Sequence, residues 1–194
     1  MTPFFSIITP SLQRESLVRC CDSITSQIAA PLWEHIVIID NAIVDADIIA
    51  KCLHSNRLFL SCGTRHNNFG NTCRHAAWER ATGTYCLYVD DDNYLAHPDV
   101  LADIGAAVLG ASFPDWAIFP IHRHGSIFFY NPPGLCFTDT LNIVVKREIG
   151  RWPDIAAREA DGHFVEKLKT LHPNYVAFPD VRPIGVMEYS SNGK

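Results

Sequence analysis

Three consecutive aspartates, Asp90, Asp91 and Asp92, directly follow an apolar and aromatic run that begins at Tyr85. Carboxylates this close repel one another unless water screens them or a cation neutralises them. In an extended chain, residues two apart face the same side, so we expect Asp90 and Asp92 to converge while Asp91 faces away. Mg²⁺ typically binds one or two carboxylates together with substrate phosphates. The run therefore indicates either a metal site or a solvated acidic turn.

The elements that position these carboxylates alternate along the first 95 residues. Short apolar runs predict buried strands, and the segments between them have apolar residues at helical spacing. We expect Asn71 to cap the third helix and Gly83 to end it. Four repeats of strand and helix predict a mostly parallel sheet covered on both faces. The predicted strands are 4–8, 36–39, 58–60 and 85–89, and the other helices are 17–28 and 48–53.

Polar residues follow each predicted strand of this half. They are Thr9, the pair Asp40 and Asn41, the loop 65–71, and the acidic run. Ligands of open parallel sheets bind beyond the carboxyl ends of the strands. Because four polar strand ends meet at one edge, we favour a metal bridging a diphosphate over a solvated turn.

The second half is less regular and predicts a smaller mixed or antiparallel region. A turn at 122–125 should join two strands into a hairpin. Nothing resembles a linker or a repeat, so we expect a single domain over residues 1–194. The predicted helices are 98–109 and 160–171, and the strands are 116–121, 126–130, 141–145 and 175–178.

Composition excludes several classes of protein. The net charge of −5 and the lack of a basic stripe argue against a nucleic-acid partner. Seven cysteines without a C-x-x-C pair predict reduced thiols and a cytoplasmic protein. The N-terminus lacks the basic and apolar segments of a secretory signal, and no run of about 18 apolar residues predicts a membrane span.

Four segments, in order and spacing, resemble the family-two glycosyltransferases. They are FSIITPSLQR from Phe5, IVIIDNAIVDAD from Ile36, NNFGNTCRHAAWERATGTYCLYVDDDNYL from Asn67, and READGHFVEKL from Arg158. The third contains the N-x-G and D-x-D motifs of the family, and the last resembles the segment that opens a late helix. Each segment alone is weakly specific, but their order covers most of the chain.

The resemblance implies a GT-A fold, which is α/β and Rossmann-like, with a nucleotide-sugar-binding half (1–95) and an acceptor-side half (96–194). It implies an inverting transfer of sugar from a nucleotide-diphospho-sugar to a hydroxyl of a glycan or lipid-linked acceptor, with Mn²⁺ or Mg²⁺. Asp161 matches the general base, and Asp92 and Asp90 match the metal ligands. The matches to donor-binding positions are Thr9, Pro10, Asp40, Asn41, Asn68, Arg74, Asp90 and Asp91.

Some alternatives stay open. The resemblance favours a UDP-sugar, but Asn41 stands where many members have a second aspartate, so the identity of the donor's nucleobase stays open. By position alone, Asp161 could cap its helix, and Glu159 could replace it as base. His163 or His172 could complete the metal site. The chain could also be a non-catalytic nucleotide-sugar-binding domain of a larger protein, or a metal-dependent nucleotidyl or phosphoryl transferase without a P-loop motif.

Overall fold

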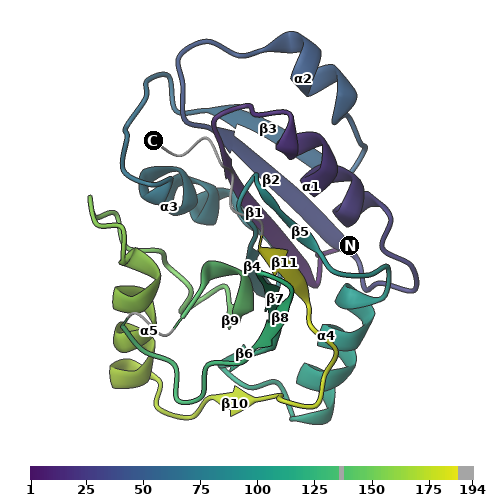
Figure 1. The fold of residues 1–194 in the computed structure, drawn as a ribbon, viewed down its shortest axis with the longest axis vertical. Helices are drawn as coiled ribbons and strands as arrows, with labels where there is room; N and C mark the ends of the chain where they lie inside the picture. Colours follow the sequence, from purple (N-terminus) through teal and green to yellow (C-terminus); the bar gives the residue numbers. More distant parts are fainter. Residues whose placement is uncertain (136–137, 188–194) are drawn as a thin grey trace.

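Seven strands form a central sheet with helices on both faces in the computed structural model, which describes residues 1–135 and 138–187 (Figure 1). The strand order is β10-β6-β9-β4-β1-β2-β3. Within the described ranges, no helix is long and apolar enough to cross a membrane. The strands are β1 (Phe5–Ser11), β2 (Trp33–Ile39), β3 (Arg57–Ser61), β4 (Tyr85–Tyr88), β6 (Trp116–Ile118), β9 (Ile143–Lys146) and β10 (Val176–Ala177). The helices are α1 (Ser16–Thr25), α2 (Ala46–Lys51), α3 (Asn71–Arg80), α4 (Val100–Gly110) and α5 (Ala160–Leu171).

Parallel pairing joins the first four strands, as the alternation of strand and helix predicts. β1 pairs in parallel with both β2 and β4, and β2 pairs in parallel with β3. All seven residues of β1 are buried, as expected for a strand covered on both faces. β9 lies antiparallel between β4 and β6. The predicted fold class, a mostly parallel α/β sheet followed by a mixed region, is confirmed.

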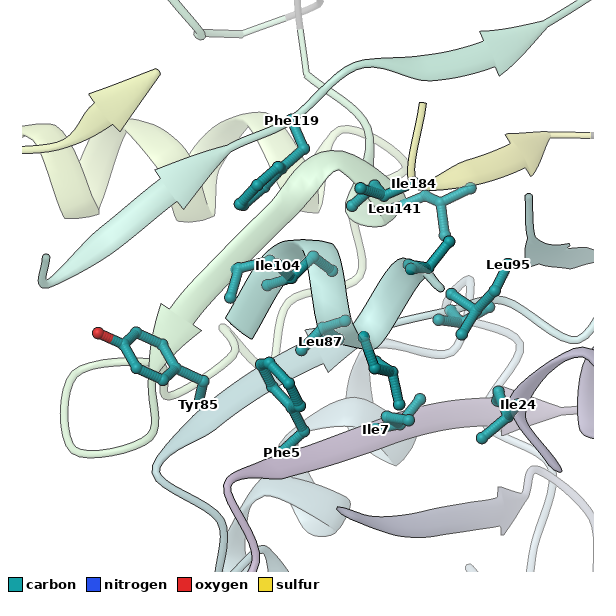
Figure 2. Close-up of a cluster of buried hydrophobic side chains, with 14 of the residues drawn as sticks. Phe5, Ile7, Ile24, Tyr85, Leu87, Leu95, Ile104, Phe119, Leu141 and Ile184 are labelled. Carbon is teal, nitrogen blue, oxygen red and sulfur yellow. The ribbon is translucent and has the colours of Figure 1, made fainter. Parts of the chain in front are cut away.

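Two apolar layers hold the helices against the sheet. On one face, Ile24 of α1 and Ile104 of α4 belong to the same buried cluster as Ile7 (Figure 2). On the other face, α3 and α5 pack in a second cluster that contains Phe164 and Ile8. Adjacent residues of β1 therefore serve opposite layers, because side chains of a strand alternate between its faces. Figure 1 shows α3 and α5 on the left of the sheet and α1 and α4 on the right.

A second sheet, in the order β5-β11-β7-β8, carries strands of three residues each. The predicted strand 116–121 is wrong, because it splits into β6 in the central sheet and β7 in the second. The break falls at Pro120, which has no N–H to donate to a ladder. The predicted hairpin is confirmed, with a turn at His124 and Gly125, both at positive φ. The strands of this sheet are β5 (Asn93–Leu95), β7 (Ile121–Arg123), β8 (Ser126–Phe128) and β11 (Gly185–Met187).

The predicted strand 141–145 also begins differently. Residues Thr140–Asn142 form a 3-10 turn, η1, before β9 starts. The Asp139 carboxylate accepts a hydrogen bond from the Leu141 N–H at 2.9 Å, and Asn142 completes a capping box with Asp139. The strand β9 therefore begins only after η1, because Asp139 caps this 3-10 turn.

Candidate active site

A cleft of about 820 Å³ opens beyond the carboxyl ends of β1, β2 and β4. It brings together most of the predicted site: Pro10, Asp40, Arg74, the run 90–92 and Asp161. These residues come from three strand ends and from helices α3 and α5, so the predicted convergence of polar strand ends is correct. The cleft is also lined by Ser11, Leu12, Arg14, Arg65, Asn67, Phe69, Gly70, Asn71, Asn93, Arg123, Thr138, Asp139, Thr140, Trp152, Arg158, Glu159, Ala160 and Met187.

The acidic run is a turn and not an extended segment. The Val89 N–H still donates to the Ile8 carbonyl of β1 at 3.0 Å, which continues the parallel ladder. The Asn93 N–H then donates to the Asp90 carbonyl at 2.9 Å, which closes a four-residue turn. The expectation of an extended run is therefore wrong. The three carboxylates meet different partners because the chain reverses direction between them.

Asp91 ties the end of β4 to the end of β1. It is almost fully buried, and its Oδ2 accepts hydrogen bonds from the Ser11 hydroxyl at 2.8 Å and the Leu12 N–H at 2.9 Å. Burial raises the pKa of Asp91 to about 6, and the nearby Arg14 opposes this shift. The two hydrogen bonds that Asp91 accepts hold the end of β4 against the end of β1, and Asp90 and Asp92 lie at this edge of the sheet.

Asp92 pairs with Arg14, a residue that the motifs do not single out. The Arg14 Nη1 donates to Asp92 Oδ2 at 2.7 Å and lies 3.6 Å from Asp91 Oδ1. Burial, followed by repulsion from Asp90, raises the pKa of Asp92. Arg14 sits in the FSIITPSLQR segment, so the only signal in the sequence was its place just after the first predicted strand.

Arg74 is the central cation of the cleft. It is buried, and its Nη2 forms an ion pair with Asp90 Oδ1. Its Nη1 donates to the Phe69 carbonyl at 2.8 Å and to Asn71 Oδ1 at 3.3 Å. The guanidinium also lies 5.0 Å from the centre of the Trp152 ring, within cation–π range. These contacts hold Arg74 against the acidic run, although its buried Nε has no hydrogen-bond partner among the described residues, and the predicted helical arginine lines the cleft.

The start of α3 differs from the prediction that Asn71 caps it. Gly70 is the N-cap, with φ 76°, and it makes no side-chain cap. A Cβ at this position would lie 2.7 Å from the Cβ of Pro10, so only glycine allows this approach to the end of β1. The Asn71 Nδ2 instead donates to two backbone carbonyls beyond β9, and its Oδ1 accepts from Trp152 Nε1 at 3.0 Å. Asn71 thus joins α3 to the segment that leads to α5.

Asp40 lies at the end of β2 and holds the loop that follows β3. It is 4% exposed, and its Oδ1 accepts a hydrogen bond from the His66 N–H at 2.8 Å. Arg65, the preceding residue, also lines the cleft. Asp40 therefore orders this loop and faces the ligand cleft at the same time.

Three residues predicted to bind the donor do not line the cleft. Thr9 is fully buried, and its hydroxyl lies 2.9 Å from His35 Nε2 within the sheet. Asn68 is buried and its side chain is bonded to the first turn of α3. Asn41 is half-buried, and its carbonyl accepts from the Ser61 hydroxyl at 2.7 Å. The cleft wall is built instead by their chain neighbours Pro10, Asp40, Asn67 and Phe69.

Two further carboxylates of the cleft, Asp139 and Asp161, interact electrostatically. Asp161 lies in the first turn of α5, where its Oδ1 accepts from the Gly162 N–H at 2.8 Å, and burial raises its pKa. Burial also raises the pKa of Asp139 to about 7, with smaller contributions from Asp90 and Asp161. Asp139 was missed in the sequence, where the only signal was a capping residue three positions before Asn142. With Asp91 and Asp92, the described part of the cleft therefore holds four carboxyls whose pKa is raised above the usual value.

Hard oxygen donors in the cleft fit a divalent cation. The Asp90 and Asp92 carboxylates line it, and their mutual repulsion is one that a cation would relieve. The buried Asn93 Oδ1 has no hydrogen-bond partner in the described part of the chain. Among those same residues, the acidic run does not form a group of three converging side-chain ligands. The residues suit Mg²⁺ or Mn²⁺ that takes one or two carboxylates and completes its shell with phosphates.

Comparison with known proteins identifies the family. The family model described as Glycosyl transferase family 2 matches residues 6–108, more than half of the chain. The chain belongs to glycosyl transferase family 2. This confirms the resemblance carried by the four segments, the first three of which overlap the matched range. A comparison with curated protein sequences gives no match.

Solved glycosyltransferase structures share the fold. S. aureus TarS 1-349 in complex with UDP-GlcNAc superimposes with a TM-score of 0.78 at 15% identity, covering 97% of this chain and 59% of TarS 1-349. The mannosyltransferase PcManGT from Pyrobaculum calidifontis, in complex with GDP-Man and Mn2+, gives 0.72 at 18% identity, covering 100% and 59%. The GT-A fold is thus confirmed. The chain spans about three fifths of the length of these two proteins.

Proposed function

We propose that this chain transfers a sugar from a nucleotide-diphospho-sugar to an acceptor hydroxyl, with inversion at the anomeric carbon. One observation carries the proposal: a single cleft joins the acidic run at the end of β4 to the helix-borne Asp161. Family membership and the donors bound by the two structural neighbours, UDP-GlcNAc and GDP-Man, support a nucleotide-sugar as the substrate.

The strand-end half would hold the donor. Asp40 and Pro10 would contact the nucleoside, and Arg74 would fix Asp90 beside the diphosphate. Five arginines line the cleft, and guanidinium groups suit phosphate oxygens. Asp92 and Asp90 would hold a Mn²⁺ or Mg²⁺ ion, which would stabilise the negative charge of the leaving diphosphate. The five arginines are Arg14, Arg65, Arg74, Arg123 and Arg158.

Asp161 would activate the acceptor. Its carboxylate takes the proton of the acceptor hydroxyl, whose oxygen attacks the anomeric carbon as the bond to the diphosphate breaks. A single displacement of this kind inverts the configuration. Burial raises the pKa of Asp161, which makes the ionised carboxylate a stronger base. We expect a glycan or lipid-linked molecule as the acceptor.

Two substitutions separate donor binding from transfer. Asp92→Ala should abolish metal-dependent binding of the nucleotide-sugar, measured by calorimetry with a panel of UDP- and GDP-sugars in Mn²⁺, Mg²⁺ or chelator. Asp161→Asn should bind the donor normally but release nucleoside diphosphate about 10²- to 10⁴-fold more slowly, as expected for loss of a general base.

Matched variants make the test decisive. Glu159→Gln changes a neighbouring carboxylate of the same cleft, and Asp180→Asn changes an exposed one. If Glu159→Gln slows transfer while Asp161→Asn does not, the base assignment is wrong. Donor binding without turnover on any acceptor would instead indicate a binding domain, and release of pyrophosphate would indicate nucleotidyl transfer.

A further inference from the structure

A second group of potential ligands lies at the ends of β2 and β3. One ligand atom from each of Asp40, Cys62 and His66 lies within 4.8 Å of the other two. We refer to these three residues as the thiol–imidazole cluster. The transfer reaction has no use for a thiol or an imidazole at this place, so the cluster needs a separate explanation.

The backbone fixes the three members of the cluster. The Cys62 N–H donates to the Ile39 carbonyl at 2.9 Å, which extends the β2–β3 ladder by one residue. Gly63, at φ 71°, then turns the loop back toward β2. The Asp40 carboxylate accepts the His66 N–H at 2.8 Å, so this residue is held at the end of the turn. The sheet edge therefore fixes the backbone positions of Cys62 and His66 relative to Asp40.

The donor atoms select the kind of cation. Zn²⁺ binds thiolate, imidazole and carboxylate at about 2.0–2.3 Å, so its ligand atoms lie about 3.3–3.8 Å apart. Small side-chain rotations from the present spacing would reach this geometry. A thiolate is a poor ligand for Mg²⁺ or Mn²⁺, which prefer oxygen, so the cluster and the acidic run differ in the metal that they suit. Three protein ligands leave a fourth position for water.

The surroundings of the cluster also suit a cation that binds sulfur. The Cys73 Sγ, in the first turn of α3, lies 3.1 Å from the Cys62 Sγ, so a second sulfur adjoins the cluster. His66 is exposed, which gives an ion access from solvent.

We infer that Asp40, Cys62 and His66 form a Zn²⁺ site whose occupation blocks donor binding. On binding, the Cys62 thiol releases its proton to solvent, and the thiolate, a neutral ring nitrogen of His66 and the Asp40 carboxylate coordinate the ion. Asp40 also lines the donor cleft. Zinc on this carboxylate therefore competes with the nucleoside, and this inhibitory part rests on the proposed function.

Cobalt tests the site directly, because Co²⁺ adopts zinc geometries and a thiolate bound to it absorbs in the near ultraviolet. The full chain, kept reduced so that Cys62 and Cys73 stay thiols, is titrated with CoCl₂ and then with ZnCl₂. We expect a thiolate charge-transfer band that Zn²⁺ abolishes. Cys62→Ser should lose the band, and His66→Ala should weaken Co²⁺ binding roughly tenfold or more.

Control variants place the band at the cluster. Cys86→Ala removes a buried thiol of β4, and His163→Ala removes an exposed imidazole of α5, and both should keep the band. Asp92→Ala, which alters the acidic run, should also keep it. A wild-type chain without the band, or a band that persists in Cys62→Ser, overturns the assignment.

Competition tests the inhibitory part. Binding of UDP and GDP is measured by calorimetry in Mn²⁺, with and without Zn²⁺, for the wild type and Cys62→Ser. Zinc should weaken binding in the wild type and have little effect in Cys62→Ser. Equal weakening in both proteins would overturn the inhibition, because zinc would then act elsewhere. If neither nucleotide binds even without zinc, the proposed function fails, while the cobalt band still decides the metal site.

Discussion

Replacing Asp139 with asparagine should remove one pH-dependent component of the free energy of unfolding. The side chain is 7% exposed, and burial first of all raises its pKa from 3.8 to about 7. The folded-state pKa of Asp139 lies above the unfolded value, so folding favours the protonated carboxyl over the ionised one. This contribution to stability is fully present below about pH 4. That contribution is lost as the pH rises through 7.

The magnitude follows from the size of the shift. A difference of about 3 pKa units corresponds to about 4 kcal/mol over the whole range, of which about 3 kcal/mol falls between pH 4.5 and 8. Asparagine cannot ionise, but its side-chain oxygen can still accept the Leu141 N–H that Asp139 accepts. The cap of η1 is therefore retained, and the substitution isolates the charge.

Urea unfolding at a series of pH values measures this effect. Wild type, Asp139→Asn and Asp180→Asn are compared in the presence of chelator, so that metal binding does not contribute. The stability of Asp139→Asn relative to wild type should increase by about 3 kcal/mol from pH 4.5 to 8. The exposed Asp180 makes the same charge change at the surface and should show no such trend. A constant difference between wild type and Asp139→Asn would refute the argument that burial controls this carboxyl.

Two further substitutions test the contacts that shape the cleft. Gly70→Ala should destabilise the fold by about 1–2 kcal/mol, because it places a Cβ at φ 76° and 2.7 Å from the Cβ of Pro10. Gly110→Ala, which meets open space at the end of α4, should be neutral or stabilising, and equal losses would contradict the steric reason. Trp152→Phe should cost about 1 kcal/mol, because the hydrogen bond to Asn71 is lost. Unchanged unfolding free energy would show that this bond contributes nothing.

Regular elements of the first half could be predicted because their signals are local. Buried runs such as 36–39 and 85–89 are continuously apolar and end in polar residues, and the structure places β2 and β4 there. The second sheet had no comparable signal. Its strands have three residues each, and β11 pairs with β5 and β7, which lie far earlier in the chain. Pairing between distant short strands depends on the packing of the whole chain.

The residues of the site also divide into those that the sequence predicted and those that it did not. The polar strand ends predicted that Asp40 would meet the acidic run, and the family resemblance added Arg74 and Asp161, which line the same cleft. The motifs did not predict that Thr9 is buried within the sheet. Whether a side chain at a strand end faces the core or the cleft depends on residues that are distant in the sequence. Asp139 was missed for the same reason: its raised pKa comes from burial beneath other segments.

The sequence by itself determined the family, the positions of the polar residues that follow the parallel strands, and the placement of three carboxylates at one edge of a sheet. The family follows from motifs that resemble its members, and the other two follow from hydrophobic runs and residue spacing, which act over a few positions. Only the tertiary structure decided what each carboxylate meets. Asp91 bonds to Ser11 across 80 residues and Asp92 pairs with Arg14 across 78, since the strand that ends at one residue lies beside a strand far away in the chain. The thiol–imidazole cluster arises in the same way, from neighbouring strand ends that only folding brings together.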